Sequence, residues 1–243
     1  MYLLFKDIKE SDKDIAINSL VNESTPKPSF FFMLVLSVVM ATCGLIINNS
    51  SVIIGSMLIA PILSPIIATA LGISIADKTL IARSIKILMK SVFYAVLLSA
   101  LTTLALWQFV IGIGGPFKEF FNPEILARTE PNIVYLFIAI VAGLTTAFAR
   151  MKPELNDSLP GTAIAIALVP PLATIGIGVA TFSLPVISGA ISMFVLNSIG
   201  IIVAALVVFS LMNIHKKRKA IKQARENADK TQEKLKQTFH DEK

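Results

Sequence analysis

Residues 51–76 read SVIIGSMLIAPILSPIIATALGISIA. This stretch holds no ionised side chain and is long enough to cross the hydrocarbon core of a bilayer, which takes about 20 residues of helix. Pro61 and Pro65 stand near its middle. Each proline lacks an amide donor and presses on the carbonyl four residues earlier. The stretch therefore predicts a transmembrane helix that is broken near its centre.

Five further apolar blocks have similar length and composition. The chain of 243 residues is 54% hydrophobic and 16% charged, whereas a soluble globular protein averages about 25% charged. Only helices and closed barrels satisfy the backbone in lipid, and the alternating pattern of a membrane barrel is absent from this sequence. We therefore expect an all-α integral membrane protein with six transmembrane helices. They are placed at residues 30–48, 51–76, 85–114, 132–149, 162–183 and 185–213.

The positive charges agree with six spans. The N-terminal segment 1–29, the second and fourth connections and the tail 214–243 together hold 20 of the 22 lysines and arginines. The other two, Lys118 and Arg128, lie in the third connection, residues 115–131. Cytoplasmic loops carry the excess of Lys and Arg. We therefore expect both termini in the cytoplasm and residues 115–131 as an extracytoplasmic loop.

The two halves of the apolar region resemble each other. Residues 55–70 match residues 165–180 at an offset of 110, with identities at Leu58/Leu168, Pro61/Pro171, Ile67/Ile177 and Ala70/Ala180. Each half, 30–114 and 132–213, then holds one span, one proline-broken span and one long span. Three spans are an odd number, so the second half must be inverted relative to the first. Many secondary transporters have this plan, with their site at broken helices near the midplane.

The broken helices supply the candidate pathway. Carbonyls left unpaired by proline need a hydroxyl, water or a cation as partner. The candidates for a substrate or ion pathway are Ser56, Pro61, Ser64, Pro65, Pro170, Pro171, Thr174 and Asn197. The alternative is that the prolines only kink packed helices and that Asn197 pairs between helices. No span holds a central carboxylate, which disfavours simple proton antiport and slightly favours a channel or an uncoupled carrier.

A polar corner joins the first two spans. Asn and Ser accept hydrogen bonds from free amides at helix starts, so we expect a capping role for the residues of this corner. They are Asn48, Asn49, Ser50 and Ser51.

Several classes of function lack a sequence signal. The basic run at residues 215–219 follows an apolar span, which favours anionic lipid over nucleic acid as its partner. Catalytic motifs and clusters of metal ligands are absent, so we expect no enzyme, no metal and no cofactor. The single cysteine, Cys43, excludes an intrachain disulfide. Six spans form a small bundle, and a homo-oligomer is expected.

Two motifs carry a family resemblance. Residues 49–61 (NSSVIIGSMLIAP) and 161–173 (GTAIAIALVPPLA) together resemble the prokaryotic membrane family named domain of unknown function 389. The resemblance covers roughly residues 30–213 and implies a protein of the inner membrane of a bacterium or archaeon. It supplies no substrate, cofactor or functional residue.

The sequence favours a membrane transporter or channel that moves a small solute or ion between the proline-broken helices. The alternative is a membrane scaffold or stress-response protein that does not transport and that acts through its basic tail and outer loop. Deletion of residues 220–243 separates the two, because a transporter keeps its flux without them and a scaffold loses its partners.

Overall fold

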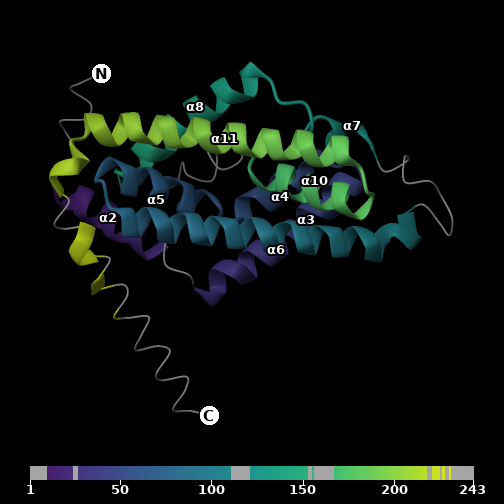
Figure 1. Cartoon of the computed structure of the whole chain (residues 1–243), viewed down its shortest axis with the longest axis horizontal. Helices are drawn as coiled ribbons and strands as arrows, with labels where there is room; N and C mark the ends of the chain where they lie inside the picture. Colours follow the sequence, from purple (N-terminus) through teal and green to yellow (C-terminus); the bar gives the residue numbers. More distant parts are fainter. Residues whose placement is uncertain are drawn as a thin grey trace, which may run out of the picture.

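The computed structural model describes residues 10–23, 27–110, 121–152, 155, 167–217, 221–224, 226–227 and 230, and within these the regular structure is helical. The helices form an elongated bundle (Figure 1). Several sequence predictions extend outside the described residues. They are parts of the N-terminal segment (1–9 and 24–26), the end of the third span (111–114), residues 115–120 of the outer loop, the start of the fifth span (162–166) and most of the basic tail.

Among the described residues, four helices are long and apolar enough to cross a membrane. They are α3 (Pro28–Ile46), α6 (Lys78–Val110), α8 (Ile133–Arg150) and α11 (Leu184–Leu211). A bent pair, α4 (Ser50–Ile59) and α5 (Leu63–Ser74), makes a fifth if it is taken as one span. The expected all-α fold with several apolar helices is confirmed. The fifth expected span, residues 162–183, contains α10 (Val169–Ala180), a shorter apolar helix of 12 residues.

The break between α4 and α5 lies at Pro61. A residue before proline is pushed out of the α conformation, and Ala60 is extended, with ψ of 125°. The two helices meet at an angle of 50°. Pro65 lies in the first turn of α5, where an amide has no partner within the helix. Pro61 therefore breaks the span and Pro65 is accommodated without cost to the helix.

Three corners between helices share one geometry. They lie at residues 44–49, 72–77 and 178–183, each beginning at a glycine. In each corner the fourth residue after the glycine has φ between 53° and 55°, and the amide of the fifth donates to the glycine carbonyl at 2.9 Å. This is the Schellman ending of a helix. A Cβ on each glycine would lie 2.9 Å from Cγ1 of the isoleucine nine residues on, so only glycine fits.

The helix boundaries repeat at an offset of 106 residues. α5 and α6 begin at residues 63 and 78, and α10 and α11 begin at residues 169 and 184 (169 minus 63, and 184 minus 78). This offset differs by one helical turn from the sequence alignment at 110, and it pairs Pro65 with Pro171. A difference of one turn keeps the same apolar faces matched, which explains why the sequence windows align at 110. At the offset of 106, Ala167, with φ of 43°, pairs with Pro61.

The short helices lie inside the bundle. α5 packs on α6 and α11, while α10 packs on α11, α6 and α3. Figure 1 shows α6 and α11 running in opposite directions along the bundle, with α5 near one end and α10 near the other.

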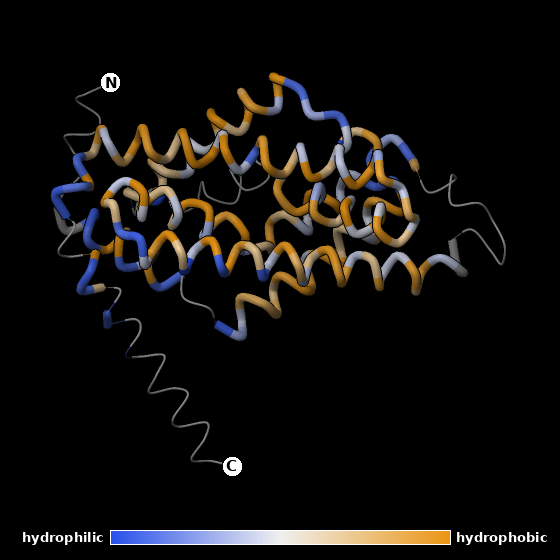
Figure 2. Tube along the Cα trace, viewed as in Figure 1, coloured by the Kyte–Doolittle hydropathy of each residue, from blue (hydrophilic) through white to orange (hydrophobic). Residues whose placement is uncertain are grey.

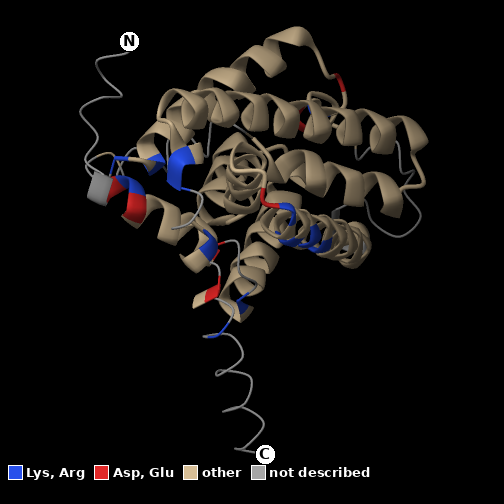
Figure 3. Ribbon diagram, turned by 60° about the vertical axis from the view of Figure 1, so that its left-hand side comes forward, with Lys and Arg blue, Asp and Glu red and all other residues tan. Residues whose placement is uncertain are grey.

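Apolar residues cover most of the length of the bundle, and hydrophilic residues gather at the end that holds α2 (Glu10–Glu23) (Figure 2). Figure 3 shows Lys and Arg concentrated around α2 and on the first part of α6.

Candidate functional site

A cavity of about 440 Å³ opens at the point where α4 ends and α5 begins. We call it the break cavity. The end of α2, the start of α3, the break itself and the end of α8 supply its walls. It is lined by Glu23, Lys27, Ser29, Phe30, Met33, Leu58, Ile59, Ala60, Pro61, Ser64 and Arg150.

Three polar side chains from separate helices meet at this cavity. Glu23 of α2 accepts a hydrogen bond from Arg150 of α8, with 2.6 Å between Oε1 and Nη1. Its Oε2 accepts from the Ser64 hydroxyl of α5 at 2.6 Å. Arg150 Nη2 lies 3.4 Å from the same Ser64 oxygen. This inner cluster of Glu23, Ser64 and Arg150 ties α2 and α8 to the start of α5.

The inner cluster keeps Glu23 ionised. Burial by itself raises the pKa of a carboxyl group, because it removes water from the charged form. The charge of Arg150 and hydrogen bonds from Ser64, Arg150 and Ser19 together outweigh burial, so the pKa of Glu23 lies below its ordinary value of 4.5. Glu23 is therefore a carboxylate at neutral pH, with both oxygens already accepting hydrogen bonds.

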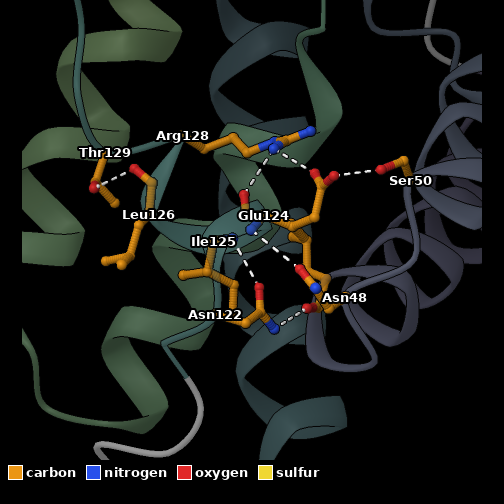
Figure 4. Close-up of polar contacts among 9 residues, drawn as sticks. Asn48, Ser50, Asn122, Glu124, Ile125, Leu126, Arg128 and Thr129 are labelled. Carbon is orange, nitrogen blue, oxygen red and sulfur yellow. Dashed lines mark hydrogen bonds and ion pairs between the residues drawn. The ribbon is translucent and has the colours of Figure 1, made fainter.

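A second polar cluster lies at the other end of α4 (Figure 4). The Ser50 hydroxyl donates to Glu124, whose carboxylate also pairs with Arg128 at 2.5 Å. The Asn122 amide donates to the carbonyl of Leu45 at 2.6 Å, and the amide of Glu124 donates to Asn48 Oδ1 at 3.3 Å. This outer cluster fastens α7 (Pro123–Leu126) to the corner between α3 and α4.

The rest of that corner starts α4. Asn49 is the N-cap, and its side-chain oxygen accepts from the amide of Val52 at 3.1 Å. Ser51 is an exposed residue in the first turn. On its other side, the loop after α7 packs on α11, where the Thr129 carbonyl rests against Gly189 with no room for a Cβ. The loop thus contacts helices from both halves of the chain.

Pro61 and Ser64 are the two predicted pathway residues that line the break cavity. Ser56 lies outside it, because its hydroxyl donates to the Ile53 carbonyl at 2.6 Å within α4. The Ser56 carbonyl, near the end of α4, accepts from Ser37 of α3 at 2.7 Å. Pro65 is buried in the first turn of α5.

The predicted residues of the second half are buried in helix packing. Pro170 and Pro171 lie in the first turn of α10, and Asn197 is 4% exposed on α11. The Thr174 hydroxyl is buried and has no hydrogen-bond partner among the described residues. None of the four lines the break cavity, so the part of the chain that the structure describes does not gather all eight predicted residues around one space.

A buried chain of hydroxyls fixes α10 in the bundle. Thr42 of α3 donates to Ser99 of α6 at 2.9 Å, and Ser99 donates to the Ala173 carbonyl of α10 at 2.7 Å. Gly176 lets the helices approach, since a Cβ there would lie 2.7 Å from the Val96 carbonyl. These polar groups hold helices together and do not line the break cavity, whose charged wall is formed by Glu23, Lys27 and Arg150.

Sequence reasoning missed Glu23, Lys27 and Arg150. It used charged residues at the ends of spans only to assign sidedness. Glu23 is acidic and stands close before the first span, and Arg150 is basic and ends the fourth. Glu23 and Arg150 have opposite charges and are expected on the same side of the membrane. These two features were the sequence signal for an ion pair between them.

Comparison with known proteins places the chain in a family. The family described as "Domain of unknown function (DUF389)" matches residues 57–203, which include α5, α6, α8 and α10. The chain belongs to this family. It is 32% identical over 184 residues to "Uncharacterized protein MJ0678" of Methanocaldococcus jannaschii, which covers 75% of this chain and 53% of that protein. The chain thus spans about half the length of this relative. No solved structure matches the chain.

Proposed function

We propose that the protein is a membrane transporter or channel for a small solute or ion, and that the break cavity forms the inner part of its pathway. The observation that carries the proposal is a helix that is broken inside an apolar bundle. A cavity lies at the break, and an ion pair forms part of the cavity wall. Non-helical backbone at membrane depth is tolerated where protein or a water-filled space surrounds it. Glu23 and Arg150 lie at the ends of α2 and α8, so their ion pair places charge at the proposed inner entrance of this space.

We infer an inverted repeat with six spans and both termini in the cytoplasm. The offset of 106 residues, the similar corners and the opposite directions of α6 and α11 support the repeat. The basic residues around α2 and the first part of α6 support the orientation. The archaeal relative supports a prokaryotic membrane. In an inverted repeat the break at Pro61 and the left-handed backbone at Ala167 occupy equivalent places.

Flux measurements test this function. The purified full chain is reconstituted in liposomes, and flux is measured across a panel of cation, anion and small-solute gradients. Pro61→Ala restores an amide donor and lets Ala60 become helical, so α4 and α5 straighten and flux of the transported species falls. Pro185→Ala is the matched control, because Pro185 is an exposed residue in the first turn of α11, outside the cavity. Flux that is equal in wild type and Pro61→Ala, or absent for the whole panel, would refute the proposal.

A further inference from the structure

The break cavity has little acceptor capacity in its side chains. Glu23 is the one carboxylate among its described lining residues, and it accepts from Ser19, Ser64 and Arg150. The break adds the carbonyl end of α4 and the amide end of α5, whose partial charges oppose each other. The side chains therefore decide which charge the cavity favours.

Donor capacity remains on the cationic side chains. Arg150 Nε is buried and has no hydrogen-bond acceptor among the described residues. The exposed Lys27 forms no ion pair with any described residue. Among the described lining residues, Glu23 balances Arg150, and Lys27 leaves one net positive charge. Unused donors and net positive charge both favour an anion.

The remaining walls are apolar. Phe30 and Met33 of α3 face the cavity together with Leu58 and Ile59 of α4. Met33 is 40% exposed and Leu58 is 49% exposed, so the apolar wall continues onto the outer surface of the bundle. A ligand that fills this space has an apolar group beside its charged one.

We propose that the break cavity binds an anion with an apolar group, through Lys27 and Arg150. The proposal deepens the proposed function and rests on it for the ligand's role as transported species. A carboxylate or phosphate group supplies the charge. It comes either from a soluble organic anion or from the headgroup of a membrane lipid, whose chains would follow the apolar wall.

Binding to the full chain in nanodiscs tests the proposal. In nanodiscs of phosphatidylcholine, calorimetric titration with benzoate should show binding, and titration with uncharged benzamide should show none. Lys27→Gln should weaken benzoate binding about tenfold, the loss of one charge-assisted hydrogen bond. Arg150→Lys keeps the charge but removes the Nε donor and should weaken binding as well. Lys90→Gln removes an exposed charge of α6 outside the cavity and should bind as wild type does.

A second arm identifies the source of the anion. If a lipid is the natural ligand, phosphatidylglycerol in the nanodisc should compete with benzoate, and it should copurify with wild type more than with Lys27→Gln. If a soluble anion is the ligand, benzoate affinity should stay the same in both nanodiscs. Three results would overturn the proposal. They are equal binding of benzoate and benzamide, equal binding by wild type and Lys27→Gln, and no binding of either benzoate or phosphatidylglycerol.

The experiment separates this proposal from the transport function. If the protein binds an anion but shows no flux of any solute, the anion site is supported and the transport function is refuted. If it shows flux of a solute but binds no anion, the transport function is supported and the anion site is refuted.

Discussion

Glu23 has a role that its place in the sequence does not reveal. It ends a short helix ahead of the first span, where the sequence suggests only a solvated cytoplasmic charge. In the fold it meets Arg150 and Ser64, which lie 127 and 41 residues away along the chain. Side chains so distant are paired only by the tertiary fold. Ser64 and Pro61 were predictable because the signal of a broken helix is local.

Acidification should weaken the inner cluster. The pKa of Glu23 is lowered on folding, so its stabilising contribution is present above 4.5 and is lost as the pH falls through the lower, folded value. Glu23→Gln should lower the free energy of unfolding at neutral pH by about 1 kcal/mol, because it removes the ion pair with Arg150. The effect is small because the Glu23 side chain is 33% exposed and solvent screens the pair. Thermal unfolding in detergent measures the difference. A difference that persists below the folded pKa would contradict the assignment.

Ala76 adopts a backbone conformation that suits glycine. Its φ is 54° at the corner between α5 and α6, and it is exposed. A left-handed residue other than glycine costs about 1 kcal/mol. Ala76→Gly should therefore stabilise the protein by about that amount in a thermal-unfolding assay. Ala105→Gly, at an exposed position inside α6, is the matched control and should destabilise by about 1 kcal/mol.

At the scale of elements, the sequence predicted the broken helix, and its alignment of the second half differs by one helical turn from the offset of the helix boundaries. Two prolines in an apolar block leave few alternatives to a break, and α4 and α5 separate at Pro61. The second half carries its prolines in the first turn of α10, after the left-handed Ala167. A left-handed alanine has no sequence signature. The glycine corners give an alignment of the two halves that agrees with the helix boundaries, because a glycine and an isoleucine nine residues later recur at the same offset of 106 residues as the helices.

The packing of α10 on α6 depends on Gly176. A Cβ there would lie 2.7 Å from the Val96 carbonyl and closer still to Ser99. Gly176→Ala should destabilise the fold by about 1 to 3 kcal/mol, since backbone cannot move aside as a flexible side chain does. Unfolding in detergent measures the loss, and Gly55→Ala, whose Cβ would meet only the flexible end of Met40, should cost less. Equal stability of Gly176→Ala and wild type would contradict the described packing.

Over the whole molecule, the two polar clusters lie at the two ends of the bent pair's first half, one at the start of α4 and one just past the break, at the start of α5. The outer cluster joins the α3–α4 corner to α7, and the inner cluster joins the start of α5 to α2 and α8. Composition predicted the all-α fold with several long apolar helices, because it depends on long stretches of sequence. The side-chain contacts within each cluster depend on how the helices pack, and the sequence pattern alone does not determine this packing.

The proposed orientation predicts opposite accessibility for the two ends. In a Cys43→Ser background, Lys27→Cys should react with a membrane-impermeant thiol reagent from the cytoplasmic face. Leu126→Cys, exposed on α7, should react from the outer face. Labelling in right-side-out and inverted vesicles measures both. Reaction of the two cysteines from the same face would contradict the proposed topology.

The central claim, that solute passes through the break cavity, is tested most directly by blocking it. Ala60→Cys in the Cys43→Ser background places a thiol in the cavity wall, and Ser192→Cys places one on an exposed face of α11. Flux in liposomes is measured before and after reaction with a charged methanethiosulfonate. The account predicts that modification of Ala60→Cys abolishes flux and that modification of Ser192→Cys leaves it unchanged. Full flux through protein that is completely modified at Ala60→Cys would contradict it.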